Sequence, residues 1–108
     1  IRIVCNVVNV ESTELLRSTA DWIRDKIGSG VIGIGSTING NPMIIITVSE
    51  DVVEMGVSAS ELVKPISEII KGGGGGRPSS AQAGGKDSSK LPIAIETIPN
   101  IIKNLTNN

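Results

Sequence analysis

The chain has to build its hydrophobic core from aliphatic side chains, because Trp22 is its only aromatic residue. Isoleucine and valine supply most of the apolar material, and their branched β-carbons favour strands over helices. The chain has 108 residues, the length of one small domain. A domain of that size buries roughly 65 % of the surface that its unfolded form exposes. We therefore expect a single domain over residues 1–108, with a small sheet at its centre.

The first quarter of the chain reads as a strand followed by a helix. Residues 1–8 are rich in β-branched side chains and predict the strand. Ser12 is a good N-cap for the helix, and Gly28 is suited to end it. Between them, apolar residues recur at the spacing of one helical face: Leu16, Ala20, Ile23 and Ile27.

A β-hairpin follows this helix. Residues 31–38 and 43–48 both read as strands, and Asn39-Gly40 between them is a dipeptide that tolerates positive φ at both positions. Three consecutive isoleucines, residues 44–46, indicate a strand that is covered on both faces. We therefore place this strand at the centre of the sheet.

The second half of the chain predicts two more helices. Residues 51–56 read as a loop or short turn, and Ser58 with Glu61 forms a capping-box pattern at the start of a helix that Pro65 should bend. A last helix is predicted from about Ser88 to Lys103, and Pro99 should kink or shorten it. The resulting order of strand, helix, two strands and two helices predicts an α+β fold. Its helices pack on a small mixed sheet that has the antiparallel hairpin at its centre.

The segment from Gly72 to Lys90 allows two interpretations. Its glycine- and serine-rich composition is most often that of a flexible linker. Alternatively, the five glycines of 72–76 form a bend whose N–H groups cradle a phosphate, with Arg77 beside it. In that case residues 79–82 open a helical turn that adds further N–H donors.

The distribution of charge favours an anionic ligand at this segment. The net charge of the whole chain is −1. Residues 1–63 hold four basic and eight acidic side chains, a balance of −4. Residues 71–90 hold four basic side chains and one acidic side chain, a balance of +3. The local potential steers a polyanion more than the total charge does, so we expect an anionic ligand here.

The residue content excludes several classes of function. The chain has no histidine, so the common His-containing metal sites and the Ser-His-Asp triad cannot form. Cys5 is the only cysteine, which excludes an internal disulfide, and its position in a predicted strand favours an inert packed thiol. The acidic residues are too scattered to share a site. We therefore expect no catalytic residue and no metal site in this chain.

The sequence shows no targeting signal. No apolar run approaches the roughly 18–20 residues that a membrane span requires, and no signal peptide is visible. We therefore expect a cytoplasmic protein without a membrane partner. Because the chain begins with Ile1 rather than Met, we expect it to be a fragment of a longer protein.

Residues 73–91 resemble a signature near the C-terminus of alanyl-tRNA synthetases. They read Gly-Gly-Gly-Gly-Arg-Pro-x-x-Ala-Gln-Ala-Gly-Gly-Lys-Asp-x-x-Lys-Leu. Residues 16–31 resemble the first helix and second strand of the same region, which is called C-Ala and is a member of the DHH-associated domain family. The resemblance covers essentially the whole chain, so residues 1–108 are identified as a single C-terminal domain of a larger chain.

The resemblance implies a nucleic-acid-binding appendage of an alanine–tRNA ligase. In that family the domain is thought to contact the elbow of alanine tRNA and to help both aminoacylation and editing. The positions that match the motif are the candidate phosphate-binding residues: Gly73, Gly74, Gly75, Gly76, Arg77, Gln82, Gly84, Gly85, Lys86 and Lys90. With Trp22 as the only aromatic residue, we expect recognition by shape and charge instead of base stacking. Three or four phosphate contacts predict that the logarithm of the RNA affinity falls with the logarithm of the salt concentration, at a slope of roughly −2 to −4 (the salt slope).

Two other functions stay open at this point. The chain could be the substrate-binding domain of a DHH-family phosphoesterase, although that branch carries a histidine in its glycine motif and this chain has none. It could also be a dimerisation module, but the helical segment that pairs in the family would precede Ile1, so we expect a monomer or a weak dimer. The expected partners are tRNA and the other domains of the parent synthetase. We expect no cofactor here, because ATP and zinc would belong to those other domains.

Overall fold

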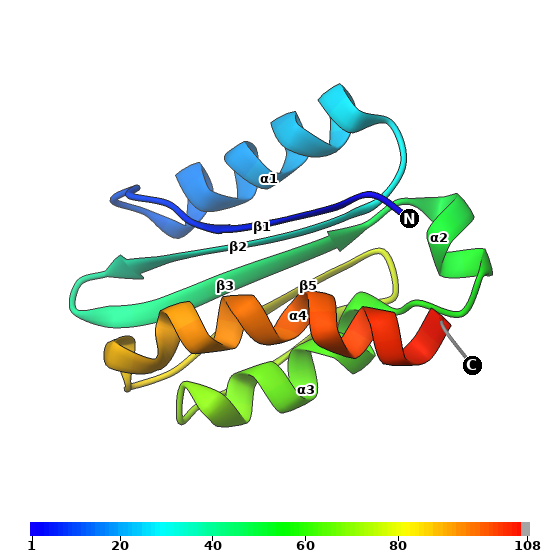
Figure 1. Cartoon of the computed structure of the whole chain (residues 1–108). Helices are drawn as coiled ribbons and strands as arrows, with labels where there is room; N and C mark the ends of the chain where they lie inside the picture. The colour runs from blue at the N-terminus through cyan, green and yellow to red at the C-terminus, as the bar shows by residue number, and fades with distance from the viewer. Residues whose placement is uncertain (107–108) are drawn as a thin grey trace.

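The computed structural model describes residues 1–106 and has three layers, with one helix on one face of a sheet and two helices on the other (Figure 1). The elements in chain order are β1 (Ile3–Val7), α1 (Thr13–Ile27), β2 (Val31–Ile38), β3 (Asn41–Val48), α2 (Glu50–Glu54), α3 (Ala59–Ile69), β4 (Gly73–Arg77), β5 (Ser80–Gly84), the 3-10 turn η1 (Ser88–Lys90) and α4 (Leu91–Thr106). The predicted α+β class, with helices on a mixed sheet, is confirmed.

The sheet has five strands in the order β1-β2-β3-β5-β4. β1 runs parallel to β2, and α1 is the crossover that connects them. β2 and β3 form the predicted antiparallel hairpin, in which Gly33 pairs with Ile46. β5 pairs antiparallel with β3, and β4 adds to β5 as the edge strand. The prediction that the isoleucine-rich strand is central is therefore correct.

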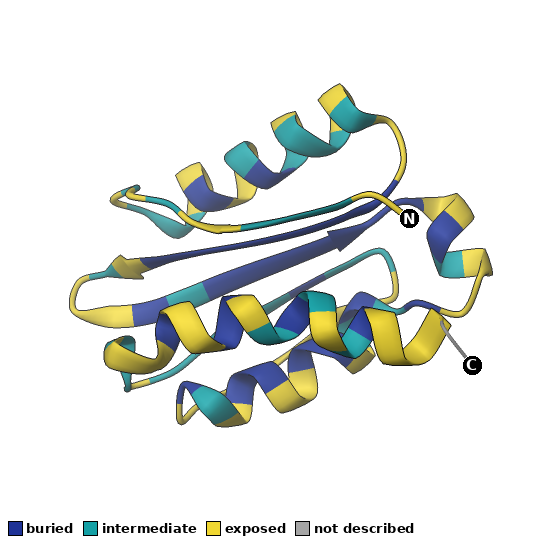
Figure 2. Cartoon of the chain, in the orientation of Figure 1, coloured by how far each residue is buried: buried dark blue, intermediate teal, exposed yellow. Residues whose placement is uncertain are grey.

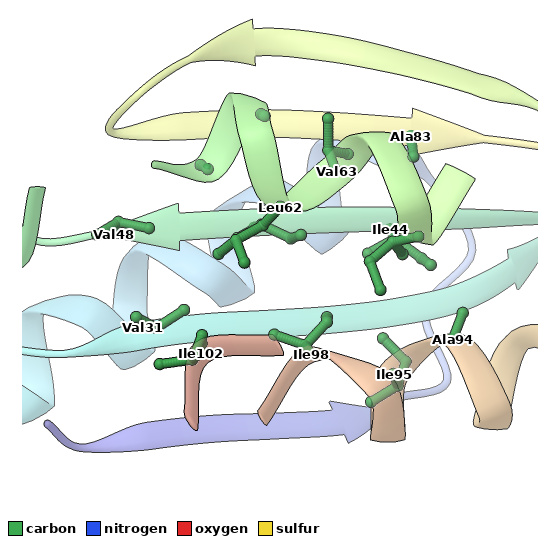
Figure 3. Close-up of a cluster of buried hydrophobic side chains, with 14 of the residues drawn as sticks. Val31, Ile44, Val48, Leu62, Val63, Ala83, Ala94, Ile95, Ile98 and Ile102 are labelled. Atoms are coloured by element: carbon green, nitrogen blue, oxygen red, sulfur yellow. The ribbon is translucent and has the colours of Figure 1, made fainter. Parts of the chain in front are cut away.

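The sheet separates two hydrophobic clusters. On one side α1 contributes Leu16 and Ala20, which pack on Ile32, Ile34 and Ile45. On the other side α3 and α4 cover the sheet, and Figure 3 shows their side chains against those of β2 and β3. Ile44 and Ile46 face this second cluster whereas Ile45 faces the first, which explains why a continuous apolar run suits β3. In Figure 2, β2 and β3 are almost entirely buried.

The ends of α1 are formed as the sequence predicts. The Ser12 hydroxyl accepts a hydrogen bond from the Leu15 N–H at 3.1 Å. At the other end Gly28 has a φ of 73°, and its N–H donates to the Arg24 carbonyl. A residue with a side chain rarely adopts that φ, so a glycine is favoured here.

The second half differs from the prediction in three places. The loop or short turn predicted at 51–56 overlaps the short helix α2, which is held by burial of Val52. The capping box does not form: the Ser58 hydroxyl bonds that of Ser60 at 2.9 Å, and the N–H of Ala59 donates to the carbonyl of Pro78. Finally, Pro99 does not shorten α4, which runs to Thr106 because buried residues on both sides of the proline hold it to the sheet.

The glycine-rich segment is neither a linker nor a bend. Gly73–Arg77 forms strand β4, and residues 80–84, whose first part was predicted to open a helical turn, form strand β5. Glycine has a low intrinsic preference for strands, so the composition alone argued against this structure. The ladder with β5 and the packing of α3 beside it hold the segment extended. The prediction of a glycine-rich turn at 72–76 is therefore wrong, whereas phosphate binding by these residues stays a prediction.

Candidate nucleic-acid interface

A groove of about 680 Å³ lies between α1 and the β4–β5 hairpin. It exists because α1 packs over β2 and β3, so that the same face of β5 and β4 is left without a helix. Side chains and backbone from four elements and one loop line it: Arg17, Asp21, Arg24, Ile45, Gly75, Gly76, Arg77, Ser79, Ser80, Ala81 and Gln82. The groove therefore joins the first helix to the glycine-rich motif, two regions about sixty residues apart.

Helix α1 contributes the charged wall of the groove. Arg17, Asp21 and Arg24 are spaced four and three residues apart, which places them on one helical face beside the buried stripe. Arg24 lies 3.5 Å from the Asp21 carboxylate and 3.6 Å from that of Asp25. Asp21 is thus paired within the helix, and half-exposed pairs of this kind contribute little to stability.

Gln82 connects the floor of the groove to this wall. Its side-chain oxygen accepts a hydrogen bond from the Arg17 guanidinium across 65 residues of sequence. In the sheet, Gln82 lies between Ile45 on β3 and Gly75 on β4. The prediction left open whether Gln82 bonds the glycine segment or a ligand, and in the structure its side-chain partner is Arg17.

The glycines of β4 divide into two groups by face. A β-carbon at Gly74 would lie 2.4 Å from the Gln82 carbonyl oxygen, and one at Gly76 would lie 2.5 Å from that of Ser80. A β-carbon at Gly73 or Gly75 would meet no atom within 4 Å. Close packing therefore explains Gly74 and Gly76, whereas Gly73 and Gly75 have no steric requirement. Successive residues of a strand face opposite sides, so these two leave a bare backbone on the groove side.

The charge of the groove suits an anion. Three arginines and one aspartate line it, a balance of +2. Arg77 is exposed and forms no ion pair within residues 1–106. A guanidinium donates in a fork that matches two oxygens of a phosphate. The groove thus offers donors of suitable geometry for a phosphate group.

The last part of the motif, from Gly84 to Lys90, lies outside the groove. Arg77 pairs with Ser80 at one end of the hairpin, and Gly73 pairs with Gly84 at the other. Four residue steps along a strand separate these ends by roughly 13 Å. Lys86 and Lys90 follow the far end, so the expected cluster of Arg77 with these lysines does not form. An antiparallel hairpin necessarily places its turn, beside Arg77, at one end and the residues that follow its second strand at the other.

Residues 84–87 have a structural role at that far end. The N–H groups of Lys86 and Asp87 both donate to the Ile70 carbonyl, at 2.9 and 3.0 Å, which satisfies the C-terminus of α3. A β-carbon at Gly85 would lie 2.2 Å from the same oxygen. The Ser89 hydroxyl, with smaller contributions from nearby Lys71 and Lys90, lowers the pKa of Asp87. These contacts join α3 to the start of α4.

Two other residues from the sequence analysis lie outside the groove. Trp22 is 63 % exposed on α1, and the Lys26 ammonium lies 5.4 Å from the centre of its ring. Because Trp22 does not line the groove, it offers no stacking platform there. Burial raises the pKa of the Cys5 thiol to about 11, with a smaller opposing effect from a hydrogen bond of the Gly33 backbone.

The described residues hold neither a cluster of metal-ligating side chains nor a membrane-spanning helix. Within residues 1–106, no three histidine, cysteine or acidic side chains lie close enough together to hold a metal ion. None of the helices there is both long and apolar enough to cross a membrane.

Sequence reasoning missed Arg17 and Arg24. The signal that could have found them is their spacing, because both lie on the helical face adjacent to the apolar stripe. Of the ten predicted residues, four line the groove: Gly75, Gly76, Arg77 and Gln82.

Comparisons with known proteins agree with this architecture. The DHHA1 domain family model matches residues 2–104. The chain is 46 % identical over 88 residues to an alanine–tRNA ligase of Chloroflexus aurantiacus. The matched residues make up 82 % of this chain and 10 % of that ligase. The chain is also 43 % identical over 91 residues to the alanine–tRNA ligase of Dehalococcoides mccartyi strain CBDB1. That match makes up 84 % of this chain and 10 % of the ligase. The chain thus spans about a tenth of the length of these relatives.

A solved structure matches over nearly the full length. It is the crystal structure of the C-Ala domain from Aquifex aeolicus alanyl-tRNA synthetase. The TM-score is 0.80 at 30 % sequence identity, and the match covers 98 % of this chain and 91 % of that one. The match extends the likeness from the motif to the arrangement of the whole fold.

Proposed function

Because this chain belongs to the DHHA1 domain family, in the form that alanyl-tRNA synthetases carry as their C-Ala domain, we propose that it is a tRNA-binding appendage of an alanine–tRNA ligase. The observation that supports the proposal most strongly is the groove between α1 and β4–β5. Its walls carry Arg17 and Arg77, and its floor is bare backbone at Gly75. An RNA strand brings one phosphate per nucleotide to such a surface.

The chemistry of the groove suits structured RNA. No aromatic side chain lines it, so the stacking that single-stranded bases require is not offered. Guanidinium groups and backbone read phosphates and ribose hydroxyls instead, which is how proteins recognise folded RNA by shape. Two or three arginine contacts predict a salt slope of about −2 to −3. This slope is at the shallow end of the range that three or four phosphate contacts predict, because Lys86 and Lys90 lie outside the groove.

We assign the elbow of alanine tRNA as the contacted region on the basis of the family resemblance. In this proposal the domain holds the tRNA while other domains of the parent chain aminoacylate it and edit it. ATP and zinc would be bound by those domains, and this one would act as a monomer or a weak dimer. The phosphoesterase alternative is less well supported, because the curated relatives compared above are alanine–tRNA ligases.

A binding titration tests the proposal. Alanine tRNA, a second tRNA, and a minihelix of the alanine acceptor and T stems that lacks the elbow are each titrated with the domain at 50 and 150 mM KCl. We expect micromolar binding of alanine tRNA at low salt, weaker binding at high salt, and a several-fold loss with the minihelix. Equal affinity for the minihelix would refute elbow contact, and no binding at 50 mM KCl would refute the function.

A further inference from the structure

The carboxamide of Gln82 has a defined orientation in the groove. A guanidinium carries only donors, so the Gln82 group that faces Arg17 must be its oxygen. The amide nitrogen therefore points away from Arg17, and its two N–H groups have no acceptor within residues 1–106. Its neighbours across the sheet, Ile45 and Gly75, offer no polar side chain.

This orientation leaves the groove rich in free donors. Arg17 keeps guanidinium N–H groups beyond the one that Gln82 accepts, and Arg77 has no ion pair in the described chain. Among the described residues that line the groove, Asp21 alone carries a carboxylate, and it is paired with Arg24. A ligand that fits these groups must offer acceptors.

We propose that Gln82 selects for backbone phosphate in this groove, by holding Arg17 in place and by donating its own amide N–H to the same ligand. The inference rests on the proposed function and makes it more specific. Phosphodiester oxygens only accept hydrogen bonds, and they carry a negative charge that suits the positive charge of the groove. Base edges are neutral, and many of them mix donors with acceptors. The groove therefore binds the strand without reading its sequence. Gln82 is a positioning residue for Arg17 and a direct contact of the RNA.

Two substitutions of similar length separate these roles. Gln82→Glu keeps an oxygen for Arg17 but replaces the amide donor by a second acceptor. Gln82→Met removes both the bond to Arg17 and the donor. We expect Gln82→Glu to lower the affinity for alanine tRNA about tenfold or more at 50 mM KCl, and Gln82→Met to lower it several-fold.

A control substitution isolates the effect of charge. Ser80→Glu adds a carboxylate to the same groove without touching the contact between Gln82 and Arg17. If Ser80→Glu weakens binding as much as Gln82→Glu, charge alone explains the loss and the donor role is refuted. If Gln82 only braces α1 against the sheet, Gln82→Glu loses no more affinity than Ser80→Glu, because its bond to Arg17 is kept and becomes charge-assisted.

A spectroscopic measurement tests the contact directly. The side-chain amide signals of Gln82 are assigned in a ¹H–¹⁵N spectrum by their loss in Gln82→Met, and alanine tRNA is then added. We expect these signals to shift together with those of Arg77. Binding of tRNA with the Gln82 amide unchanged would overturn this inference and leave the proposed function intact. Absence of any binding would refute the function itself.

Discussion

Gln82 lies directly opposite Gly75 in the β4–β5 ladder, so this pair presents one side chain, not two, to the groove. The carboxamide leans toward α1, where its oxygen accepts from Arg17, while the Gly75 backbone stays uncovered. A charged wall and a bare floor thus meet at a single cross-strand pair. In the proposed function, the glycine at position 75 leaves the floor of the groove open to the ligand, although packing does not require glycine there.

Substitutions at Gly75 and Gly74 should have opposite effects. Gly75→Val places a β-branched side chain in open space, so we expect no loss of stability but a several-fold loss of tRNA affinity. Gly74→Ala forces a β-carbon to within 2.4 Å of the Gln82 carbonyl oxygen, and we expect a loss of about 1–3 kcal/mol in the free energy of unfolding. Urea denaturation and tRNA titration measure the two effects. Unchanged tRNA binding by Gly75→Val would mean that the floor does not contact RNA.

Removing the guanidinium of Arg77 should remove one phosphate contact. We expect Arg77→Ala to weaken binding and to make the salt slope less negative by about 0.9. Lys103→Ala is the matched control, because Lys103 lies on α4, on the other side of the sheet. Titrations of alanine tRNA from 50 to 200 mM KCl measure both slopes. Equal losses in the two variants would show that net charge, and not the groove, controls binding.

The pH dependence of stability should report on Asp51. The Ser29 hydroxyl and then the Ser49 hydroxyl donate to its carboxylate, at 2.5 and 2.6 Å, and hold its pKa below the ordinary value. A pKa that is lower in the folded state stabilises the fold above the unfolded value of about 3.9. This contribution disappears as the pH falls through the folded pKa.

The test of Asp51 compares melting temperatures across pH. We expect Asp51→Asn to lower the Tm at pH 7 and the difference from the wild type to shrink below about pH 4. Glu96→Gln, at an exposed position of α4, serves as the control and should change little. A Tm difference that stays constant from pH 7 to pH 3 would contradict the role of the charged carboxylate.

The thiol of Cys5 should react slowly in the native state. Burial raises its pKa to about 11, so at pH 8 very little of the reactive thiolate is present. We expect alkylation by iodoacetamide at pH 8 to be much slower in the folded domain than in 8 M urea, as followed by mass spectrometry. Equal rates in the two conditions would show that Cys5 is accessible and not packed.

The elements that the sequence predicted correctly are those with strong local signals. Asn39-Gly40 supplies the turn of the β2–β3 hairpin, and φ at both residues is positive, as the dipeptide suggests. Ser12 begins α1 and Gly28 ends it, each through a hydrogen bond with a residue three or four positions away. The triple isoleucine predicted the central strand, since only a strand buried on both faces suits such a run. Each of these signals comes from residues that lie close together in the sequence.

The glycine-rich segment shows where local signals fail. Its composition predicts flexibility or a bend, because glycine gains little from a strand by itself. The segment is a strand because β5 pairs with it and α3 packs against it, so the energy that holds it comes from other elements. The same holds for α2, a helix of five residues that exists through burial of Val52.

The sequence by itself determined the composition of the glycine-rich motif, the family to which it belongs and the local elements of the first half. Only the tertiary structure decided which cations lie together. It separates Arg77 from Lys86 and brings it into one groove with Arg17. The physical reason is the order of strands in the sheet. β5 lies between β3 and β4, so the hairpin that carries Arg77 lies beside the strands that α1 covers. That order depends on pairings between distant segments, which the spacing of residues along the chain does not contain.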